Sequence, residues 1–498
     1  MTGKLLTLYF VFQLLAGSQA VQPGWNRDGK IKPLFTISKE TTYVKGPIDK
    51  QGYVDYVTAI NKRLSKGVSP KDNANVLLWK AIGPRPEGST MPDEYFKWLG
   101  AKQPSEKGKY FDTSGVEVAS ELGTRPWTPE QFPTLARWLK NNERPLELVI
   151  QATRRKQYYN PLVPMKEQNG KRGHLVAALL PNVQKTREFA YALRARAMMR
   201  TAQKQYTQAW DDLLACHRLA RHIGRGGTLI ENLVGYAIAS VAADSSVAYL
   251  RHADLDAKQL LGCLKDLQSL PPHQSPAETL DKFERMVYLD CIMMLDREGV
   301  DGLNYLGDVQ LPVPFIGRVD WDPALKIGNR WYDRIVATIR IQDRKLRQQK
   351  LDTIHIELRG LKESTTSPLG VARYVLGPNA RGRMMGEILL CLLFPTVSRI
   401  QQAHERVEQL HTNARVAFAL AAYRKDNGNY PKKLTALTPK YLPKRPRDVF
   451  SGKDLVYRCN GDRYLLYSIG INEKDEGGRS YEDDPPGDDL RVQMSDRK

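Results

Sequence analysis

Three side chains on one predicted helix have the types and spacing of metal ligands. His404, Glu408 and His411 follow one another at i, i+4 and i+7, so they share one face of a helix. Glu408 and His411 also have the Glu-x-x-His spacing of carboxylate-bridged metal sites. Such a site needs a matching motif on a second helix, and the sequence shows none. Because the two histidines lie about 10 Å apart along the helix axis, we interpret them as residues flanking a packed face.

The segment GPNARGRM, from Gly377 to Met384, has nearly the spacing of a phosphate-binding loop. The chemistry of that loop is missing, however. Arg383 stands where the phosphate-binding lysine belongs, Met384 replaces the hydroxyl that holds magnesium, and Pro378 removes an amide donor. No G-x-S-x-G, H-E-x-x-H or cysteine and histidine signature occurs either. The sequence therefore predicts no catalytic residue and no cofactor-binding residue.

The last hundred residues should position the most polar loop of the chain. Ile400, Val407, Leu410, Ala414 and Ala421 recur at helical spacing, and this run ends at an Asn-Gly pair followed by a proline. Short aromatic and β-branched runs follow, separated by the turn sequences SGKD and NGD. This order predicts one long helix packed on a small antiparallel sheet.

These parts together resemble a known domain. The helix, then YRKDNGNYP, YLPKRPRDVFSG, LVYR, YLLYSIG and an acidic Gly-Gly loop, is similar to the C-terminal domain of the type G pseudopilins of type II secretion. The similarity covers about a fifth of the chain. The whole chain resembles large exported planctomycete-type proteins that carry such a domain and have no assigned activity. The resemblance implies a fold and a compartment, whereas a shared fold does not assign a function.

The resemblance also implies a calcium site in the acidic loop. In type G pseudopilins an S-x-G-x-D…GG…D loop holds calcium, and Ser468, Gly470, Gly477 and Gly478 stand at similar places here. Calcium takes six to eight oxygen ligands. The possible carboxylate donors are Asp475, Glu476, Asp483, Asp484, Asp488 and Asp489, and we select Asp475, Asp483, Asp484, Asp488 and Asp489 as the candidate calcium ligands.

The loop departs from the pseudopilin pattern in two ways. Asn472 occupies the place of an aspartate, and SYEDDPP lengthens the loop. A solvated acidic loop is the alternative to a calcium site. A bound ion would fasten the loop and would not catalyse a reaction.

The rest of the chain is predicted to be helical. Apolar spacing is sustained from Pro181 to Leu270, the Thr228 to Glu231 segment is a capping box, and Ser275 begins a further helix. We also expect a helix to begin with Thr128 as its cap and Pro129 in its first turn, and one long helix from about Ala324 to Gln349. The fold class is thus mainly α with a C-terminal α+β domain, in which a helical array precedes the long helix and its sheet.

Four regions follow from this pattern. We expect a signal peptide at residues 1–20, an aromatic-rich helical region at 21–165, a helical array at 181–380 and the pseudopilin-like domain at 394–498. The first region has a lysine, a mainly apolar run of twelve residues from Leu5 to Ala16, and then Ser18 and Ala20. We therefore predict cleavage near Ala20 and export to the periplasm, the cell envelope or the medium. We expect no transmembrane segment in the mature chain.

The charge is distributed unevenly. The chain carries a formal net charge of +20, but the segment from Ser451 onward has 11 acidic and 8 basic residues. A basic exported body attracts anionic polymers and surfaces. The leading hypothesis is a non-catalytic exported protein that acts as a scaffold for macromolecular interactions, with a protein or an anionic envelope polymer as partner and no specific nucleic acid. The alternatives are a hydrolase with its active site in the helical region, and an electrostatic binder of anionic polymer.

Overall fold

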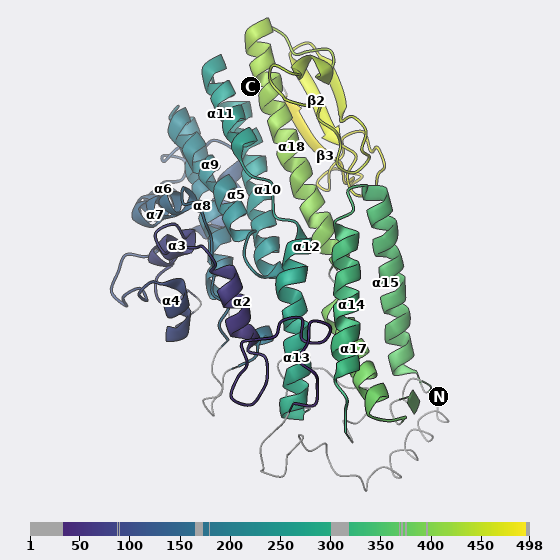
Figure 1. Cartoon of the computed structure of the whole chain (residues 1–498). Helices are drawn as coiled ribbons and strands as arrows, with labels where there is room; N and C mark the ends of the chain where they lie inside the picture. Colours follow the sequence, from purple (N-terminus) through teal and green to yellow (C-terminus); the bar gives the residue numbers. More distant parts are fainter. Residues whose placement is uncertain are drawn as a thin grey trace, which may run out of the picture.

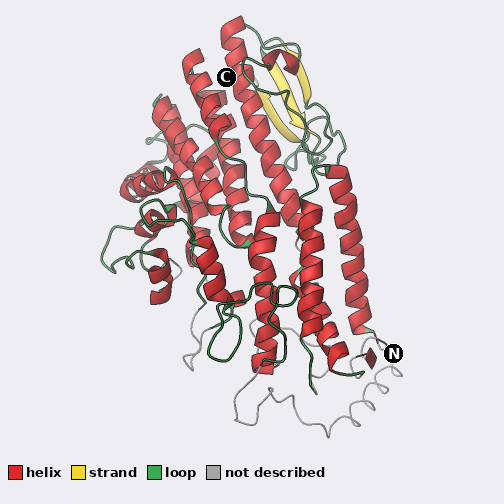
Figure 2. Cartoon of the chain, viewed as in Figure 1, coloured by secondary structure: helices red, strands yellow, loops and turns green. Residues whose placement is uncertain are grey.

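The chain folds into a long helical body with one small sheet at one end (Figures 1 and 2). The computed structural model describes residues 33–494 except 87, 89, 165–172, 179, 300–317, 368, 370–371, 374–375 and 395–396. The predicted signal peptide and its cleavage point at Ala20 lie outside the described residues. The predicted fold class, mainly α with a C-terminal α+β part, is confirmed.

The α-helices in chain order are α2 (Tyr56–Leu64), α3 (Ala74–Ile82), α4 (Asp93–Leu99), α5 (Val116–Glu121), α6 (Pro133–Asn141), α7 (Glu143–Thr153), α8 (Pro181–Ala202), α9 (Tyr206–Ile223), α10 (Leu229–His252), α11 (Ala257–Ser269), α12 (Pro276–Thr279), α13 (Arg285–Glu298), α14 (Asp322–Ile339), α15 (Arg344–Thr366), α17 (Pro378–Leu393) and α18 (Val397–Asn427). A π-helical turn, Leu280–Glu284, joins α12 to α13.

Local capping sets several of these helix ends as predicted. At the start of α10, the Thr228 side chain accepts from the backbone N–H of Glu231, and the Glu231 side chain accepts from the N–H of Thr228. Ser275 caps α12, with a proline in the first turn. Helix α18 ends at Asn427, and Gly428 follows with φ +82°, a conformation that favours glycine.

Two predicted helix boundaries are wrong. Helix α6 begins at Pro133 because Thr128 closes a turn instead, its backbone N–H donating to the side chain of Gln131 at 2.9 Å. The helix predicted from Ala324 to Gln349 is two helices, since α14 ends at Ile339 and Asp343 caps α15 by accepting from the N–H of Leu346 at 2.8 Å. Apolar spacing continues across this break, so periodicity alone did not show it.

The sheet contains β1 (Val456–Asn460), β2 (Arg463–Ser468) and β3 (Leu490–Met494), antiparallel and in that order. Asn460 pairs with Arg463 across the tight turn between β1 and β2, where Gly461 has φ +59°. Helix α18 packs against β2 and β3. The Asn413 side chain of α18 donates to the carbonyl of Leu490 at 2.8 Å, which fixes the start of β3 on the helix.

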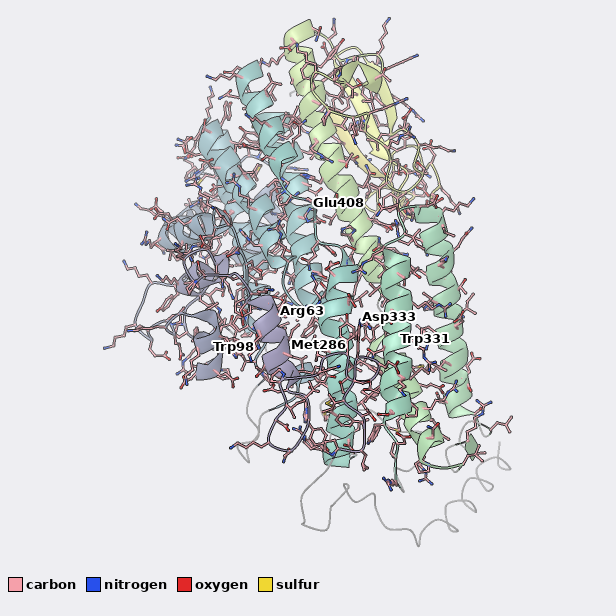
Figure 3. All side chains as sticks on the ribbon, in the orientation of Figure 1. Arg63, Trp98, Met286, Trp331, Asp333 and Glu408 are labelled. Atoms are coloured by element: carbon pink, nitrogen blue, oxygen red, sulfur yellow. The ribbon has the colours of Figure 1, made fainter. Side chains whose placement is uncertain are left out.

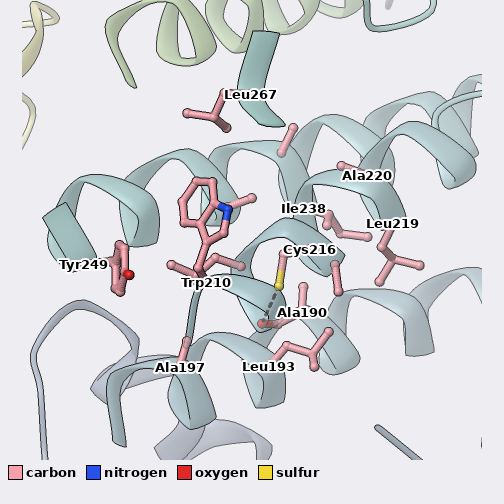
Figure 4. Packing of buried hydrophobic residues seen from close by; sticks show 14 of the residues in the cluster. Ala190, Leu193, Ala197, Trp210, Cys216, Leu219, Ala220, Ile238, Tyr249 and Leu267 are labelled. Carbon is pink, nitrogen blue, oxygen red and sulfur yellow. Dashed lines mark hydrogen bonds between the residues drawn. The ribbon is translucent and has the colours of Figure 1, made fainter. Parts of the chain in front are cut away.

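Two large apolar cores and one small cluster hold the described body together, and the small cluster packs α4 against Trp79 of α3. The first core contains side chains from α3 and from α5 to α11, together with α18 and the sheet, and Figure 4 shows the part of it around Trp210 and Cys216. The second core contains side chains from α2, from α12 to α15, from α17 and from the start of α18. The first core crosses the predicted boundary at residue 394 without a break. The predicted domain boundaries stay predictions.

Where the structure describes the chain, two helical stretches have the length and apolar composition to cross a membrane: α10, and residues 378–427, which run over positions outside the described set. Of the most apolar window in each stretch, 67% and 62% are buried inside the fold. Length and composition do not distinguish a buried core helix from a membrane span. The expectation of no transmembrane segment therefore stays a prediction.

Candidate metal centre in the C-terminal loop

The loop between β2 and β3 brings three carboxylates together. One oxygen each of Glu476, Asp488 and Asp489 lies within 4.8 Å of the others, and within the described residues this is the group that could hold a metal ion. Asp488 and Asp489 are 8% and 2% exposed. Glu476 Oε2, Asp488 Oδ1 and Asp489 Oδ1 are buried and have no hydrogen-bond partner. Buried polar atoms are normally hydrogen-bonded, and these three partnerless oxygens belong to a group that could hold a metal ion.

Hydrogen bonds within the loop hold the other oxygen of each carboxylate. Asp488 Oδ2 accepts from the N–H of Asn472 at 3.0 Å, and Asp489 Oδ2 accepts from the N–H of Gly478 at 2.7 Å. Glu476 Oε1 accepts from the side chain of Asn472 at 2.7 Å. Asn472 thus orients two of the three carboxylates, and its amide N–H₂ can donate to Glu476, which an aspartate at this position could not do.

Glycines allow the loop to close this tightly. Gly470 has φ +71°, and a Cβ there would collide with the backbone and the side chain of Asp488. Gly478 has φ +89°, which lets its N–H face Asp489. The predicted S-x-G and Gly-Gly elements therefore shape the loop around the carboxylates.

The electrostatics of the cluster favour a cation. Burial raises the pKa of Asp489 to about 6, and the charges of Glu476, Asp475 and Asp488 push it in the same direction, against the hydrogen bond from Gly478. A divalent cation with a preference for oxygen, such as calcium, would offset both the burial of the Asp489 charge and its repulsion by the neighbouring carboxylates. Glu476, Asp488 and Asp489 would hold it through their free oxygens. A bound calcium ion would supply charge neutralisation and a cross-link within the loop.

Of the five calcium ligands selected from the sequence, two lie in the carboxylate cluster and three lie elsewhere in the loop. Asp488 and Asp489 lie in the cluster. Asp475 accepts from the Tyr467 hydroxyl at 2.8 Å, which lowers the pKa of its carboxyl. Asp483 accepts from the N–H of Ser480 and pairs with Arg491, while Asp484 is exposed.

Glu476 was one of the six possible donors but not one of the five selected ligands. Its place in the cluster depends on the bond from Asn472, and that bond was not visible in the sequence.

The histidines singled out on α18 do have neighbours on a second helix. The His411 ring lies 5.8 Å from the ring of His217 on α9 and 6.2 Å from the ring of His273, measured between centroids. Glu408, labelled midway along α18 in Figure 3, accepts from the backbone N–H of His273 at 3.1 Å. The His404 ring packs against Tyr236. We call His217, His273, His404 and His411 the histidine cluster.

The histidine cluster is neutral and lies beside a cation. Arg221 Nη2 donates to His411 Nε2 at 3.2 Å. Burial lowers the pKa of His217 to about 3, and the charge of Arg221 lowers it further. Burial likewise lowers the pKa values of His273, His404 and His411. Because an arginine already occupies one imidazole nitrogen and repels other cations, the cluster is better suited to packing than to holding a metal.

A histidine does meet carboxylates in the second core. His174 Nε2 bonds to Glu298 at 2.7 Å, and His174 Nδ1 lies 3.8 Å from Asp290. Burial lowers the pKa of His174, but the bond to Glu298 and the two negative charges outweigh burial and raise it. His174 is 5% exposed. The contact joins residues 173–178 to α13. The hydrolase that the sequence analysis named as an alternative stays a prediction.

The segment GPNARGRM is not a loop. Helix α17 begins at Pro378, and a Cβ at Gly382 would collide with the carbonyl of Asp320. This glycine allows close packing, and its backbone does not cradle a phosphate.

Comparisons with protein-family models, with curated proteins and with solved structures found no match to this chain. The resemblance to type G pseudopilins stays a prediction from the sequence. The function is therefore argued from the geometry of the acidic loop.

Proposed function

We propose that this chain is an exported, non-catalytic calcium-binding protein that acts as a scaffold for macromolecular interactions. The observation that supports the calcium site is the set of three buried, partnerless carboxylate oxygens on Glu476, Asp488 and Asp489. Extracellular calcium modules work at millimolar to submillimolar affinity, so an exported chain would meet enough calcium to fill such a site.

The position of the loop supports a scaffolding role for the ion. Arg344 of α15 pairs with Glu405 of α18 at 2.9 Å and also with Glu473 in the loop. The loop therefore contacts helices that contribute to both apolar cores. Calcium would hold Glu476 to Asp488 and Asp489 and so keep the Glu473 side of the loop against α15. The ion would make the end of the body rigid for a partner.

The partner proposed for this scaffold is a protein or an anionic polymer of the cell envelope. The net charge of +20 favours anionic surfaces. We propose no specific nucleic acid, because the sequence contains no nucleic-acid-binding motif.

The proposal is tested by calcium titration of the purified chain. We expect one calcium ion per chain by isothermal titration calorimetry, with magnesium much weaker because it prefers a smaller, more regular site. The Asp488→Asn, Asp489→Asn double variant should lose binding while it keeps its helical circular dichroism. Asp484→Asn, which changes an exposed carboxylate of the same loop, is the control and should bind as the parent does. Absence of calcium binding by the parent would refute the site.

Export is tested separately by fractionating producing cells and sequencing the N-terminus of the protein. We expect a mature chain that begins near Val21, outside the cytoplasm. An intact N-terminus in the cytoplasmic fraction would contradict the proposal.

A further inference from the structure

A second charge imbalance, of opposite sign, lies beside α9. A pocket of about 680 Å³ opens between the C-terminal end of α7, one face of α9 and the end of α11. In Figure 1 these helices lie on the side of the body away from α14 and α15. The pocket is lined by six cationic side chains and only two carboxylates; the cations are Arg154, Arg155, Lys156, Arg218, Arg221 and Arg225. We call this site the basic pocket.

The helical repeat explains why the charges converge. Asp211, Leu214, Arg218 and Arg225 recur at intervals of three, four and seven residues along α9 and just beyond it, so they share one face. The three consecutive cations, residues 154–156, follow directly after the end of α7, which packs on α9. Helices that end side by side therefore bring both basic groups to one opening.

Four of these six cations have no ion-pair partner within the part of the chain that the structure describes. Arg154, Lys156, Arg218 and Arg225 form no ion pair with any residue that the structure describes. Arg155 donates to the carbonyls of Pro70 and Asn73, which are neutral. The lining carboxylate of Asp266 already accepts from the Trp210 indole at 2.8 Å. Burial lowers the pKa of His222 to about 4, so this lining histidine adds no charge near neutral pH.

Arg221 forms the buried side of the basic pocket. Its guanidinium donates to the carbonyls of Pro271 and His217 at 2.7 and 2.9 Å, besides the bond to His411. All three acceptors are neutral, and burial lowers the pKa of Arg221 to about 10. The negative charge of Glu408 opposes this lowering, so the protein compensates the buried charge of Arg221 in part. An anion in the pocket would add to that compensation.

Another pocket shows that basic lining alone does not create such an imbalance. A pocket of about 500 Å³ between the end of α10 and α18 contains Arg424 and Lys425, and also Arg251, which donates to the carbonyl of Gln493 at 3.1 Å. There, Arg424 pairs with Asp462 at 2.7 Å, and Lys425 pairs with Asp254 at 3.7 Å. The protein itself neutralises these cations, whereas it leaves those of the basic pocket unmatched.

Helix dipoles do not account for the excess charge. Cations at a helix C-terminus interact favourably with the partial negative charge of the last carbonyls. That charge is about half an elementary charge for each helix, and three helices, α7, α9 and α11, end near the basic pocket. Six cations exceed what these three ends can balance.

We propose that the basic pocket binds a compact polyanion that carries two or more phosphate or sulfate groups. Arg218 and Arg225 would bind it through paired N–H donors, which match the oxygens of such groups. Arg154 and Lys156 would complete the contact from the α7 side. This site is separate from the acidic loop and does not depend on calcium.

The test is calorimetric titration of the full chain with inorganic pyrophosphate at constant ionic strength. Calcium is removed beforehand with an immobilised chelator, because a soluble chelator is itself a polyanion. We expect pyrophosphate to bind with one ion per chain, at least tenfold more tightly than inorganic phosphate. The Arg218→Gln, Arg225→Gln variant should weaken pyrophosphate binding at least tenfold.

The matched control is the Arg424→Gln, Lys425→Gln variant, which removes two positive charges from the pocket between α10 and α18. We call that pocket the neutralised pocket, because both of these cations are paired there. This variant should change the dissociation constant for pyrophosphate less than twofold. Equal weakening by both variants would show general attraction to a basic protein and would overturn the proposal, as would no binding by the parent. The melting temperature of each variant shows whether it is folded. If the Arg218→Gln, Arg225→Gln variant does not fold, the Arg154→Gln, Lys156→Gln variant tests the pocket in its place.

Long-chain polyphosphate distinguishes a free anion from one carried on a polymer. If the polymer binds more tightly than pyrophosphate and the Arg218→Gln, Arg225→Gln variant weakens both, the pocket takes the anionic groups of a polymer. If only pyrophosphate depends on these arginines, the pocket takes a free anion. If the polymer binds the Arg218→Gln, Arg225→Gln variant as tightly as it binds the parent, and pyrophosphate does not bind at all, the proposed anion site is refuted.

Discussion

The acidic loop and the basic pocket are opposite examples of charge that the protein leaves unmatched. In the loop, two backbone N–H groups and the Asn472 side chain fix one oxygen of each carboxylate, and the other oxygen is buried without a partner. In the pocket, the cations sit at helix ends, and Arg154, Lys156 and Arg225 are exposed. Buried charge costs far more than solvated charge. Calcium should therefore change the stability of the fold, whereas an anion should change little beyond its own binding.

A third region of charge, on α8 and α9, is balanced inside the protein. Asp212 is fully buried and accepts from Arg196 at 2.6 and 3.0 Å and from Arg200 at 2.7 Å. It provides the reference for the two unmatched sites, because here every charge has a partner within the chain.

The largest expected effect comes from breaking this balanced site. Asp212→Asn leaves two cations with a neutral partner, and losing one member of a buried ion pair costs about 3–5 kcal/mol. The free energy of unfolding from urea denaturation measures this loss. Asp211→Asn, at the exposed neighbouring position, is the control and should stay within about 0.5 kcal/mol of the parent. Equal losses of unfolding free energy in both variants would show that the buried ion pair stabilises the fold no more than the exposed carboxylate does.

A smaller effect, which depends on pH, comes from the histidine cluster. An unfolded histidine gains a proton below about pH 6.5, whereas folded His217 does so only near pH 3. Between these values the unfolded chain binds more protons, so the folded state loses stability as the pH falls. This loss is about 1.4 kcal/mol per pH unit, and the His217→Gln variant lacks it.

The difference in unfolding free energy between the parent and His217→Gln should therefore shift by about 2.3 kcal/mol from pH 6.5 to pH 4.5, in favour of the variant. Urea denaturation at several pH values measures the shift. His355→Gln, on the exposed side of α15, controls for the loss of a histidine. Parallel stability curves for the parent and His217→Gln would mean that folded His217 gains its proton as readily as the unfolded residue does.

The smallest effect is expected at the neutralised pocket. Arg424 and Asp462 form an ion pair at 2.7 Å in which both side chains are largely exposed. Exposed pairs contribute about 0–1 kcal/mol, so Arg424→Gln should change the unfolding free energy by less than about 1 kcal/mol. A larger loss would mean that charge in this pocket is as consequential as buried charge, and the comparison would fail.

Features set by neighbouring residues could be predicted from the sequence. The capping box at Thr228, the end of α18 before Gly428 and the turn between β1 and β2 each depend on a few adjacent residues. Asp488 and Asp489 were selected because the resemblance to the type G pseudopilin loop implies acidic residues after the Gly-Gly pair. Such features need no knowledge of tertiary structure.

Features set by contacts between distant segments could not be predicted. His273 lies in a segment without periodicity, and it meets His411, which is 138 positions away in the chain. The basic pocket combines residues that follow α7 with residues of α9, and the sequence shows them only as scattered charges. The spacing with Glu408 did single out His404 and His411, two members of the histidine cluster. It gave no sign that His217 and His273 lie beside them.

The measurement that tests the central claim most directly compares thermal and urea unfolding of the parent and Asp489→Asn, each in calcium and in chelator. At a calcium concentration 100 times the dissociation constant, the parent should gain about 2.7 kcal/mol, and the variant should gain little. In chelator the variant should be more stable than the parent, because it removes one of three crowded negative charges. If calcium leaves the parent unchanged, or stabilises both proteins equally, the acidic loop is not a calcium site.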